Sequence, residues 1–346
     1  MKATRIITII CWCISALALT GLVLWILFAS PFVGSVGNWR FIDFNLNLGG
    51  MESLSGPFEP VGTHRVSDIS DIDSLDIDWV SGTINIKPHD GNEIVITEFA
   101  QRALYDNEKM SVSTHDNTLR IEYIEGNRIG RMPTKHLEVL IPQSLSSDMK
   151  RLVVDATSGR ITLYDISAQI IYLNATSGGF DLSNVIADLI TLDGTSGSVN
   201  ISNSSSTELR IDITSGSQNI SGSFDSIYID GTSGRLTVNN DAPSSSISVS
   251  VTSGSQDITG SFSYVNLSCT SGSITIVSRE VPESLRISNT SGNINITIPN
   301  EGTVSLHHSS TSGRFSSDVP VIMQGRSDAM WRISSTSGNL NINELR

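Results

Sequence analysis

Five aspartates lie close together near the start of the polar part of the chain, and carboxylates at such short intervals could bind a cation. They are Asp68, Asp71, Asp73, Asp76 and Asp78. A calcium site needs about six to eight oxygen ligands that converge on one point, and the glycine-spaced loops that achieve this are missing here. Alternation with Leu75 and Ile77 places Asp76 and Asp78 on the outward face of a strand. We therefore predict a solvated strand face and no metal site.

The histidines and cysteines offer little further metal or redox chemistry. The histidines are scattered, at His64, His89, His115, His136, His307 and His308. Only the last two are adjacent, and neighbouring residues of a strand point to opposite faces, so they cannot easily share an ion. Cys11 and Cys13 lie in an apolar N-terminal run, which leaves Cys269 without a partner for an internal disulfide. We predict that Cys269 is a buried small residue and that no cofactor is bound.

A serine recurs in the tripeptide Thr-Ser-Gly, which occurs ten times. A nucleophile is needed once, whereas a structural corner is needed in every repeat, so we interpret these serines as structural. The copies begin at Thr157, Thr176, Thr195, Thr214, Thr232, Thr252, Thr270, Thr290, Thr311 and Thr336, and a degenerate copy is Val80-Ser81-Gly82. Repetition at a period near 20 residues is the sequence signature of a solenoid.

Apolar residues alternate with polar ones on both sides of each copy, as Leu152, Val154 and Ala156 do before Ser158 and Ile161 and Leu163 after it. The phase slips by one residue at the glycine, which indicates two short strands that meet at a corner. Glycine suits such a corner because it tolerates positive φ. The predicted corner glycines are Gly82, Gly159, Gly178, Gly197, Gly216, Gly234, Gly254, Gly272, Gly292, Gly313 and Gly338.

Two repeats carry a glutamine where the others have an apolar residue at the first inward position after the corner. These are Gln218 and Gln256. Either their amides bond to groups inside the coil, or their strands rotate slightly outward.

The predicted fold is all-β: a parallel β-helix-like β-solenoid of about eleven coils of 19–20 residues, preceded by one N-terminal transmembrane helix. An antiparallel sandwich is the alternative, but regularly spaced hairpin signals are missing. A solenoid end needs a cap, because an open end exposes unpaired strand groups. We assign residues 67–150 to irregular first coils and an N-terminal cap, and residues 151–346 to the regular repeats.

The membrane helix is predicted at residues 6–28, which contain no charged residue and follow Lys2 and Arg5. Such a run can cross a hydrocarbon core of about 30 Å, and the positive-inside rule places residues 1–5 in the cytoplasm and the C-terminal domain outside. A cleaved signal peptide is the alternative, which Pro31 after Ala29 and Ser30 disfavours. Residues 29–66 read as a tether, part of which could pack as a cap.

The net charge of the chain bears on the partners that it can bind. The formal net charge is −13, and a field of that sign disfavours nucleic acid and anionic membrane surfaces.

Two stretches carry a family resemblance. Ser74-Leu-Asp-Ile-Asp-Trp-Val-Ser-Gly-Thr-Ile-Asn-Ile-Lys87, and His136–Pro142 followed by Leu152–Leu163, resemble the bacterial putative-adhesin domain of unknown function. The resemblance covers about residues 65–346 and implies a β-solenoid anchored in a bacterial envelope, with relatives that accompany envelope-stress genes. It supplies no functional residues.

The predicted function is non-catalytic binding or scaffolding in the cell envelope. A flat face rich in hydroxyl and amide groups suits a cell-wall or surface glycan, and neighbouring envelope proteins are the alternative partners. One rival function is an accessory of envelope-stress signalling that acts through its membrane anchor. Another is a polysaccharide-active enzyme, which needs carboxylates clustered across neighbouring coils. The acidic residues of the array occur singly and, on this interpretation, at no shared stacking position: Asp165, Asp181, Asp193, Asp212 and Asp230.

Overall fold

The computed structural model describes residues 57–124, 133–326 and 330–346, which all lie in the second of two compact units, Leu54–Arg346. The predicted membrane helix, residues 6–28, and residues 29–56 of the predicted tether lie outside these ranges. Among the described residues, no helix has the length and apolar character that a bilayer crossing requires.

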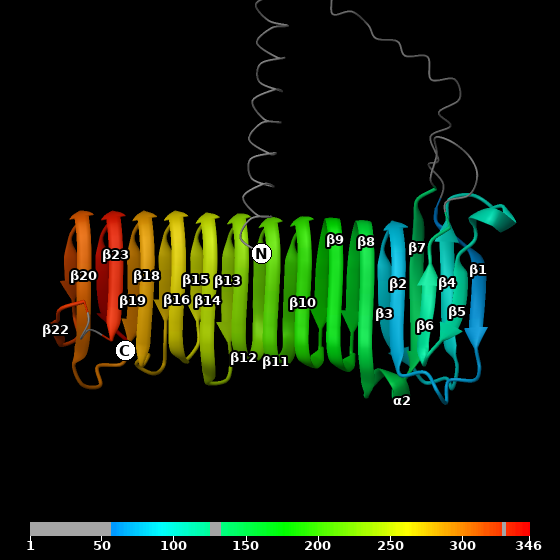
Figure 1. Ribbon diagram of the computed structural model, residues 1–346, viewed down its shortest axis with the longest axis horizontal. Helices are drawn as coiled ribbons and strands as arrows, with labels where there is room; N and C mark the ends of the chain where they lie inside the picture. Colours follow the sequence, from blue (N-terminus) through cyan, green and yellow to red (C-terminus); the bar gives the residue numbers. More distant parts are fainter. Residues whose placement is uncertain (1–56, 125–132, 327–329) are drawn as a thin grey trace, which may run out of the picture. The chain divides into compact units, whose positions relative to one another are not determined.

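The described residues form one 24-stranded sheet that winds around a single core (Figure 1). Two short helices interrupt it, η1 at Asp106–Glu108 and α2 at Gln143–Ser146. The first strands are β1 Glu59–Val66, β2 Ser74–Ser81, β3 Ile84–His89, β4 Ile94–Ala100, β5 Ser111–His115, β6 Thr118–Glu122, β7 Lys135–Pro142, β8 Met149–Tyr164, β9 Ser167–Ser183, β10 Ile186–Ser196, β11 Val199–Ser215 and β12 Gln218–Ser233. The remaining strands are β13 Leu236–Asn240, β14 Ser244–Ser253, β15 Gln256–Thr259, β16 Phe262–Ser271, β17 Ile274–Val277, β18 Ser284–Ser291, β19 Ile294–Ile298, β20 Val304–Ser312, β21 Phe315–Ser317, β22 Val321–Met323, β23 Trp331–Ser337 and β24 Leu340–Glu344.

Successive repeats stack as parallel coils whose equivalent residues pair. The serine of each Thr-Ser-Gly copy is in register with the serine of the neighbouring coil, as in Ser158 with Ser177 and Ser196 with Ser215. The strands before the corner form one face, and those after it form another. The predicted all-β, mainly parallel repeat fold is confirmed.

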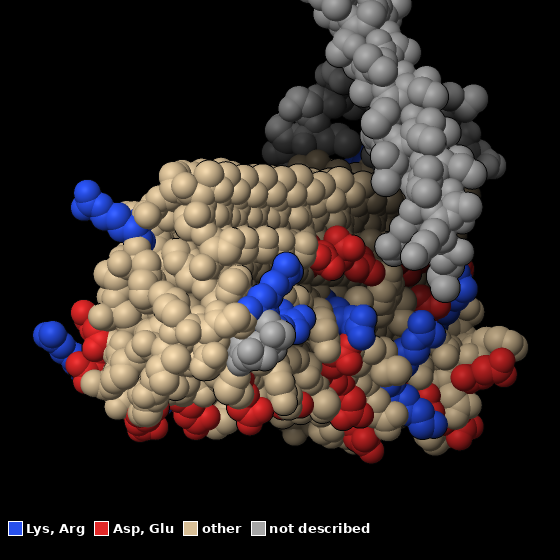
Figure 2. Space-filling view, turned by 60° about the vertical axis from the view of Figure 1, so that its left-hand side comes forward, with Lys and Arg blue, Asp and Glu red and all other residues tan. Residues whose placement is uncertain are grey.

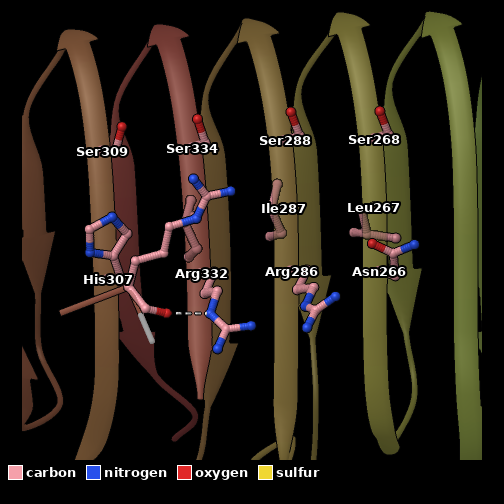
Figure 3. Close-up of a pocket in the computed structure, with 12 residues that line it drawn as sticks. Asn266, Leu267, Ser268, Arg286, Ile287, Ser288, His307, Ser309, Arg332 and Ser334 are labelled. Atoms are coloured by element: carbon pink, nitrogen blue, oxygen red, sulfur yellow. Dashed lines mark hydrogen bonds between the residues drawn. The ribbon is translucent and has the colours of Figure 1, made fainter. Parts of the chain in front are cut away.

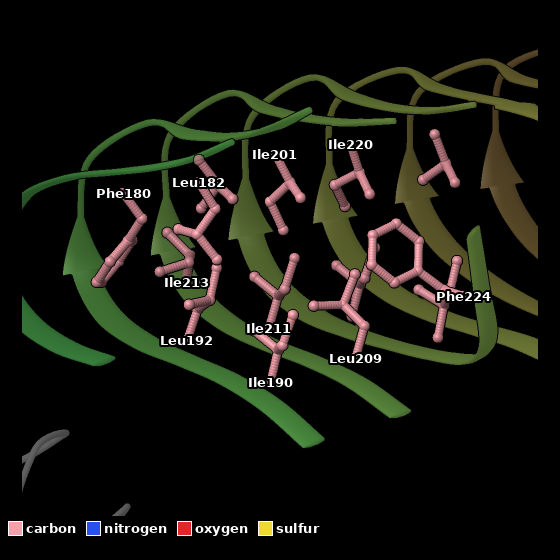
Figure 4. Close-up of a cluster of buried hydrophobic side chains, with 14 of the residues drawn as sticks. Phe180, Leu182, Ile190, Leu192, Ile201, Leu209, Ile211, Ile213, Ile220 and Phe224 are labelled. Carbon is pink, nitrogen blue, oxygen red and sulfur yellow. The ribbon is translucent and has the colours of Figure 1, made fainter. Parts of the chain in front are cut away.

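The core consists of the inward residues of every coil. Ile190 is in register with Leu209 of the next coil, and Leu192 is in register with Ile211. These side chains are each at most 2% exposed and lie in the interior of the stack (Figure 4). Each coil buries its apolar side chains mainly against its two neighbours, so stability accumulates along the stack.

The stacking order departs from the sequence order at both ends. Strand β2 lies between β6 and β8, and β23 lies between β18 and β20. The last repeat in the sequence is therefore inserted between the two repeats that precede it. As a result, β23 pairs with β18 and β20, and β24 pairs with β19 and β21. The outermost coil contains β20 and the long segment that follows it.

Antiparallel strands cover the N-terminal end of the stack. Strand β5 pairs with β6, and β4 pairs with β7 and β1. Residues Glu59–Val66, which belong to the predicted tether, are thus the sheet strand β1, because their backbone pairs with β4. An antiparallel edge cannot extend the parallel stack, so it closes this end.

The corner glycines approach one another more closely than any side chain would allow. Gly197 has φ +149°, and a Cβ atom built on it would lie 1.3 Å from the carbonyl oxygen of Gly178 in the previous coil. The same contact recurs from Gly159, which faces Gly82, to Gly313, which faces Gly338. All eleven corner glycines named above have positive φ. The outermost N-terminal coil has Lys135 at this position, and Lys135 contributes the carbonyl that faces Gly82.

Both buried glutamines point inward. Gln218 is 5% exposed and Gln256 is fully buried, and both lie in the same column, separated by Leu236. Neither amide atom of Gln256 has a hydrogen-bond partner among the described residues, and the same holds for Gln218 Oε1. The side chains lie inward, as the first alternative requires, but these amide atoms do not form the internal hydrogen bonds that it predicted.

We expect Gln256→Leu to stabilise the protein by about 1–3 kcal/mol, because it removes a buried amide whose hydrogen-bonding groups are unpaired. Leucine matches Leu236 in the adjacent coil. Thermal denaturation of the full chain followed by circular dichroism measures the change. Gln324→Leu, at an exposed position, is the control and should leave the midpoint unchanged. A lower midpoint for Gln256→Leu would refute this account.

Candidate functional site

The outward side chains form rows that run along the stack, one residue from each coil. After the corner, one row contains Asp181, Asn200 and Asn219 from consecutive coils. Asn200 Nδ2 donates to Asp181 Oδ1 at 2.8 Å, and Asn219 Nδ2 donates to Asn200 Oδ1 at 3.2 Å. Similar bonds join Asn341 to Asn295 and Ser316 to Asn341. These bonds order the amides in one direction and hold the row rigid.

A second row, three residues before the corner serine, is acidic over half of the stack. The register aligns Asp155 with Asn174, Asn174 with Asp193, Asp193 with Asp212, and Asp212 with Asp230. We call this the aspartate row. The prediction that the acidic residues share no stacking position is therefore wrong for Asp193, Asp212 and Asp230. Asp181 is in register with Thr162, after the corner, and Asp165 bonds to Asn184 of the next coil beyond the end of β8, so both belong to other positions of the coil.

The stacked carboxylates influence one another. Burial, followed by the charges of Asp193 and Asp230, raises the pKa of Asp212. A hydrogen bond to Asp193 is the main reason that the pKa of Tyr172 rises to about 12. Carboxylates on adjacent strands lie about 5 Å apart, a separation at which like charges favour the protonated form.

The same row continues as serines in the C-terminal coils, from Ser250 to Ser268, Ser288, Ser334 and Ser309. Two residues before these serines, the parallel row reads Asn266, Arg286, Arg332 and His307. Figure 3 shows the two rows side by side on consecutive strands. The part of these rows that begins at Asn266 and Ser268 lines a groove of about 1110 Å³ together with Arg326, and we call it the arginine groove.

The face seen in Figure 2 separates uncharged rows from charged groups. Rows of uncharged side chains run along its upper part, and most lysines, arginines, aspartates and glutamates gather below them. The molecule thus offers a surface of uncharged rows beside charged ones.

A family model described as Toastrack DUF4097 matches residues 72–262 and 225–343. The chain belongs to this family. The predicted family resemblance is therefore confirmed, and the Toastrack domain covers almost all of the described residues.

Comparison with individual proteins adds no function to the Toastrack domain. No curated protein matches the chain. A "putative adhesin" of Bacteroides fragilis is 10% identical, with 82% of this chain and 96% of that chain covered and a TM-score of 0.31. A "putative adhesin" of Parabacteroides distasonis is 12% identical, with 83% and 98% covered and a TM-score of 0.36. One from Parabacteroides merdae is 13% identical, with 82% and 96% covered and a TM-score of 0.31. These similarities are too low to carry an argument about ligands.

The five N-terminal aspartates do not converge in the Toastrack domain. Asp68 accepts a hydrogen bond from Ser70 Oγ at 2.8 Å, and Asp73 pairs with Lys150 at 2.6 Å. Asp78 instead extends the aspartate row, because it is in register with Asp155. Burial, and then the charge of Asp155, raises the pKa of Asp78. No group of three or more metal-ligating side chains occurs within the part of the chain that the structure describes.

The adjacent histidines take different positions, as predicted from strand geometry. His307 is in register with outward Arg332, and His308 is in register with the core residue Ile333. Cys269 is 3% exposed, which confirms the predicted buried small residue, and burial raises the pKa of its thiol.

A buried ion pair in the cap of the Toastrack domain escaped the sequence analysis. Lys135 Nζ lies 2.7 Å from Glu98 Oε1, and both side chains are fully buried. Lys135 Nζ also donates to the carbonyl of Glu108 at 2.7 Å and lies 3.8 Å from the centre of the Tyr123 ring. Glu98 Oε2 accepts from the backbone N–H of Met110 at 3.1 Å. Burial lowers the pKa of Lys135 against the opposing effect of Glu98. Since no solvent reaches the pair, it is a structural feature of the cap.

We expect the outermost C-terminal coil of the Toastrack domain to loosen in mild acid because of His308. Burial, and then the charge of His307, lowers the pKa of His308, and Nε2 is buried without a hydrogen-bond partner among the described residues. As pH falls through the ordinary histidine range, the unfolded segment takes up a proton before the folded one, so stability falls with pH.

Hydrogen exchange of the β20 amides as a function of pH measures this effect. His308→Phe should remove the acid-induced increase in exchange, whereas His115→Gln, at an exposed position, should retain it. Equal pH dependence in the wild type and His308→Phe would assign the effect to other groups.

Proposed function

We propose that the Toastrack domain is a non-catalytic, adhesin-like binding module outside the cytoplasmic membrane. Residues 6–28 anchor it, and its ligand is a polymer of the cell wall or surface. The observation that supports this proposal best is the set of outward rows, in which polar side chains of neighbouring coils stand in register.

The regularity of the rows favours a repeating ligand. Neighbouring strands are about 4.8 Å apart, so hydroxyl and amide groups recur at that interval along the stack. Hydrogen bonds between the amides hold them in place before a ligand arrives, which lowers the entropy cost of binding. A linear polymer with polar groups at short intervals can bond several coils at once.

Retention of the full-length protein, in detergent, on purified cell wall from its source organism tests the proposal. We expect the wild type to be retained. The triple variant Thr195→Val, Thr214→Val and Thr232→Val removes three stacked, exposed hydroxyls while keeping side-chain shape, and it should be retained less. Failure of the wild type to bind any wall fraction would reject the binding function.

A specific observation favours one second candidate, an enzyme that cleaves polysaccharides. The aspartate row places Asp193, Asp212 and Asp230 on adjacent strands, and the raised pKa of Asp212 suits a general acid. Retaining glycosidases use two carboxyl groups about 5–5.5 Å apart. Shortening of wall polysaccharide by the wild type, and its loss in Asp212→Asn, would replace the binding proposal with this one. Unchanged chain length would exclude catalysis on the glycan tested.

The other rival is an accessory of envelope-stress signalling that acts through the anchor. Replacing residues 6–28 with an unrelated membrane helix separates the two functions. A binding module should keep its wall retention and cellular effect with either anchor, whereas a signalling accessory should lose its effect on the stress response.

A further inference from the structure

We propose that the arginine groove binds a linear glycan that carries carboxylate or phosphate groups, with the polymer running along the stack across the last four coils. This inference rests on the proposed binding function and assigns to it one site and one ligand class.

The charge distribution singles out these coils. The whole chain has a formal net charge of −13, whereas residues 263–346 contain six arginines and six acidic residues. None of the described residues that line the arginine groove is acidic. An anionic polymer repelled by the aspartate row would therefore meet a more favourable charge at these coils.

One arginine of the groove, Arg286, has no acidic partner among the described residues. In the ion pairs between described residues, every lysine or arginine lies at position 210 or earlier in the sequence. Arg286 therefore belongs to none of these ion pairs. Arg286 is exposed beside the serine row. Its charge is consequently available to a ligand rather than compensated within the fold.

A neighbouring arginine is already oriented. Arg332 Nε donates to the carbonyl oxygen of Arg326 at 2.7 Å, which directs its guanidinium group, and Figure 3 shows this bond. An oriented guanidinium can form two parallel hydrogen bonds to a carboxylate or phosphate, which lysine cannot do. Arg286 and Arg332 are directly in register on adjacent strands.

The shape of the groove favours a polymer over a single small anion. Asn266, Arg286, Arg332 and His307 occupy one position in four neighbouring coils, a length of about 14 Å at the usual strand spacing. The volume of about 1110 Å³ exceeds what one phosphate would fill. Ser268, Ser288, Ser334 and Ser309 run parallel to this row, so hydroxyl groups of a sugar chain meet serines while its acidic groups meet arginines.

The same register sets where such a polymer would end. Beyond Ser250 the serine row becomes the aspartate row at Asp230, where carboxylate ligands are repelled. The site is thus bounded on one side by the carboxylates of the aspartate row, and on the other side it extends to the outermost coil, which contributes His307 and Ser309. This arrangement makes the groove selective for segments of the polymer in which only a few consecutive sugar units are negatively charged.

The test measures binding of the full-length protein to three defined polymers: oligogalacturonate for carboxylate, inorganic polyphosphate for phosphate, and dextran as the neutral control. We expect the protein to bind one or both anionic polymers and not dextran. The affinity for the anionic polymers should fall as the ionic strength rises. The double variant Arg286→Gln and Arg332→Gln should lower the affinity about tenfold.

Arg235→Gln is the matched control, because Arg235 is also exposed and forms no ion pair among the described residues, but lies outside the groove. It should change the affinity less than twofold. Equal losses in both variants would show general charge attraction and overturn the proposal, as would anionic binding that survives the double variant. Tighter binding of single-stranded DNA than of either polymer would assign the groove to nucleic acid instead.

Wall retention separates this inference from the function on which it rests. If the wild type binds cell wall and the double variant binds equally well, the binding function stands and the arginine groove is not its site. If the wild type binds no wall fraction, the proposed function itself fails.

Discussion

Gly197→Ala should destabilise the protein by about 3–5 kcal/mol, a large effect for the addition of one methyl group. The backbone at Gly197 has φ +149°, a region that costs an L-residue about 1–3 kcal/mol. The added Cβ would also lie 1.3 Å from the carbonyl oxygen of Gly178, so the two coils must separate. Denaturant unfolding of the full chain followed by circular dichroism measures the loss.

Gly302→Ala is the control that isolates backbone strain from close approach. Gly302 has φ +84°, but a Cβ atom built there meets no other atom within 4 Å. Its replacement should cost about 1–2 kcal/mol. If the two variants lost equal stability, the contact between corner glycines would have no energetic importance.

The periodic part of this fold could be predicted because the same pattern of apolar residues around a corner glycine recurs in each repeat. Apolar residues on both sides of Gly159 recur around Gly197 and Gly338, and the inward positions they predict are buried. An error at one repeat is outweighed by agreement among the others. The corner glycines could be predicted for the same reason, since every coil must turn at the same point.

The stacking order could not be predicted for the opposite reason. The repeats at Thr290, Thr311 and Thr336 carry the same pattern, so any of them could pair with any other in the same register. Only the connecting segments distinguish the arrangements, and residues 318–330 between β21 and β23 are irregular in sequence. The insertion of β23 between β18 and β20 therefore follows from packing that periodicity does not encode.

The aspartate row was predictable and was missed. Asp193, Asp212 and Asp230 each lie two residues before the threonine of a Thr-Ser-Gly copy, so they share one position of the coil. Asn174 interrupts the run of acids, which hides the pattern when aspartates alone are compared. Aligning all residues on the corner serine would have found it.

The buried pair of Lys135 and Glu98 left no such signal, because both residues lie in the irregular N-terminal region. Lysine is rarely fully buried, and nothing in its neighbours predicts an exception. Lys135 occupies the corner position of the outermost coil, where no further coil requires a glycine, and this freedom permits a long side chain.

Lys135→Met should therefore destabilise the protein by about 3–5 kcal/mol, because it leaves the Glu98 carboxylate buried without its cation. The N–H of Met110, which donates to Glu98 Oε2, carries no charge that could replace the lysine. The comparison is Lys87→Met, which breaks the partly exposed pair with Glu138 and should cost less than about 1 kcal/mol. Thermal unfolding of the full chain distinguishes the two, and a small effect at Lys135 would mean that water reaches the cap.

The double variant Glu98→Leu and Lys135→Met decides what the pair contributes. Removing both charges eliminates the desolvation cost of each, and buried pairs replaced by apolar residues are often as stable as before. We expect the double variant to recover most of the stability lost in Lys135→Met. Glu98 and Lys135 belong to β4 and β7, which pair antiparallel and start the cap. Recovered stability together with altered hydrogen exchange in β4 would show that the ion pair selects the register of the cap, since charges that must meet permit only one alignment of the two strands.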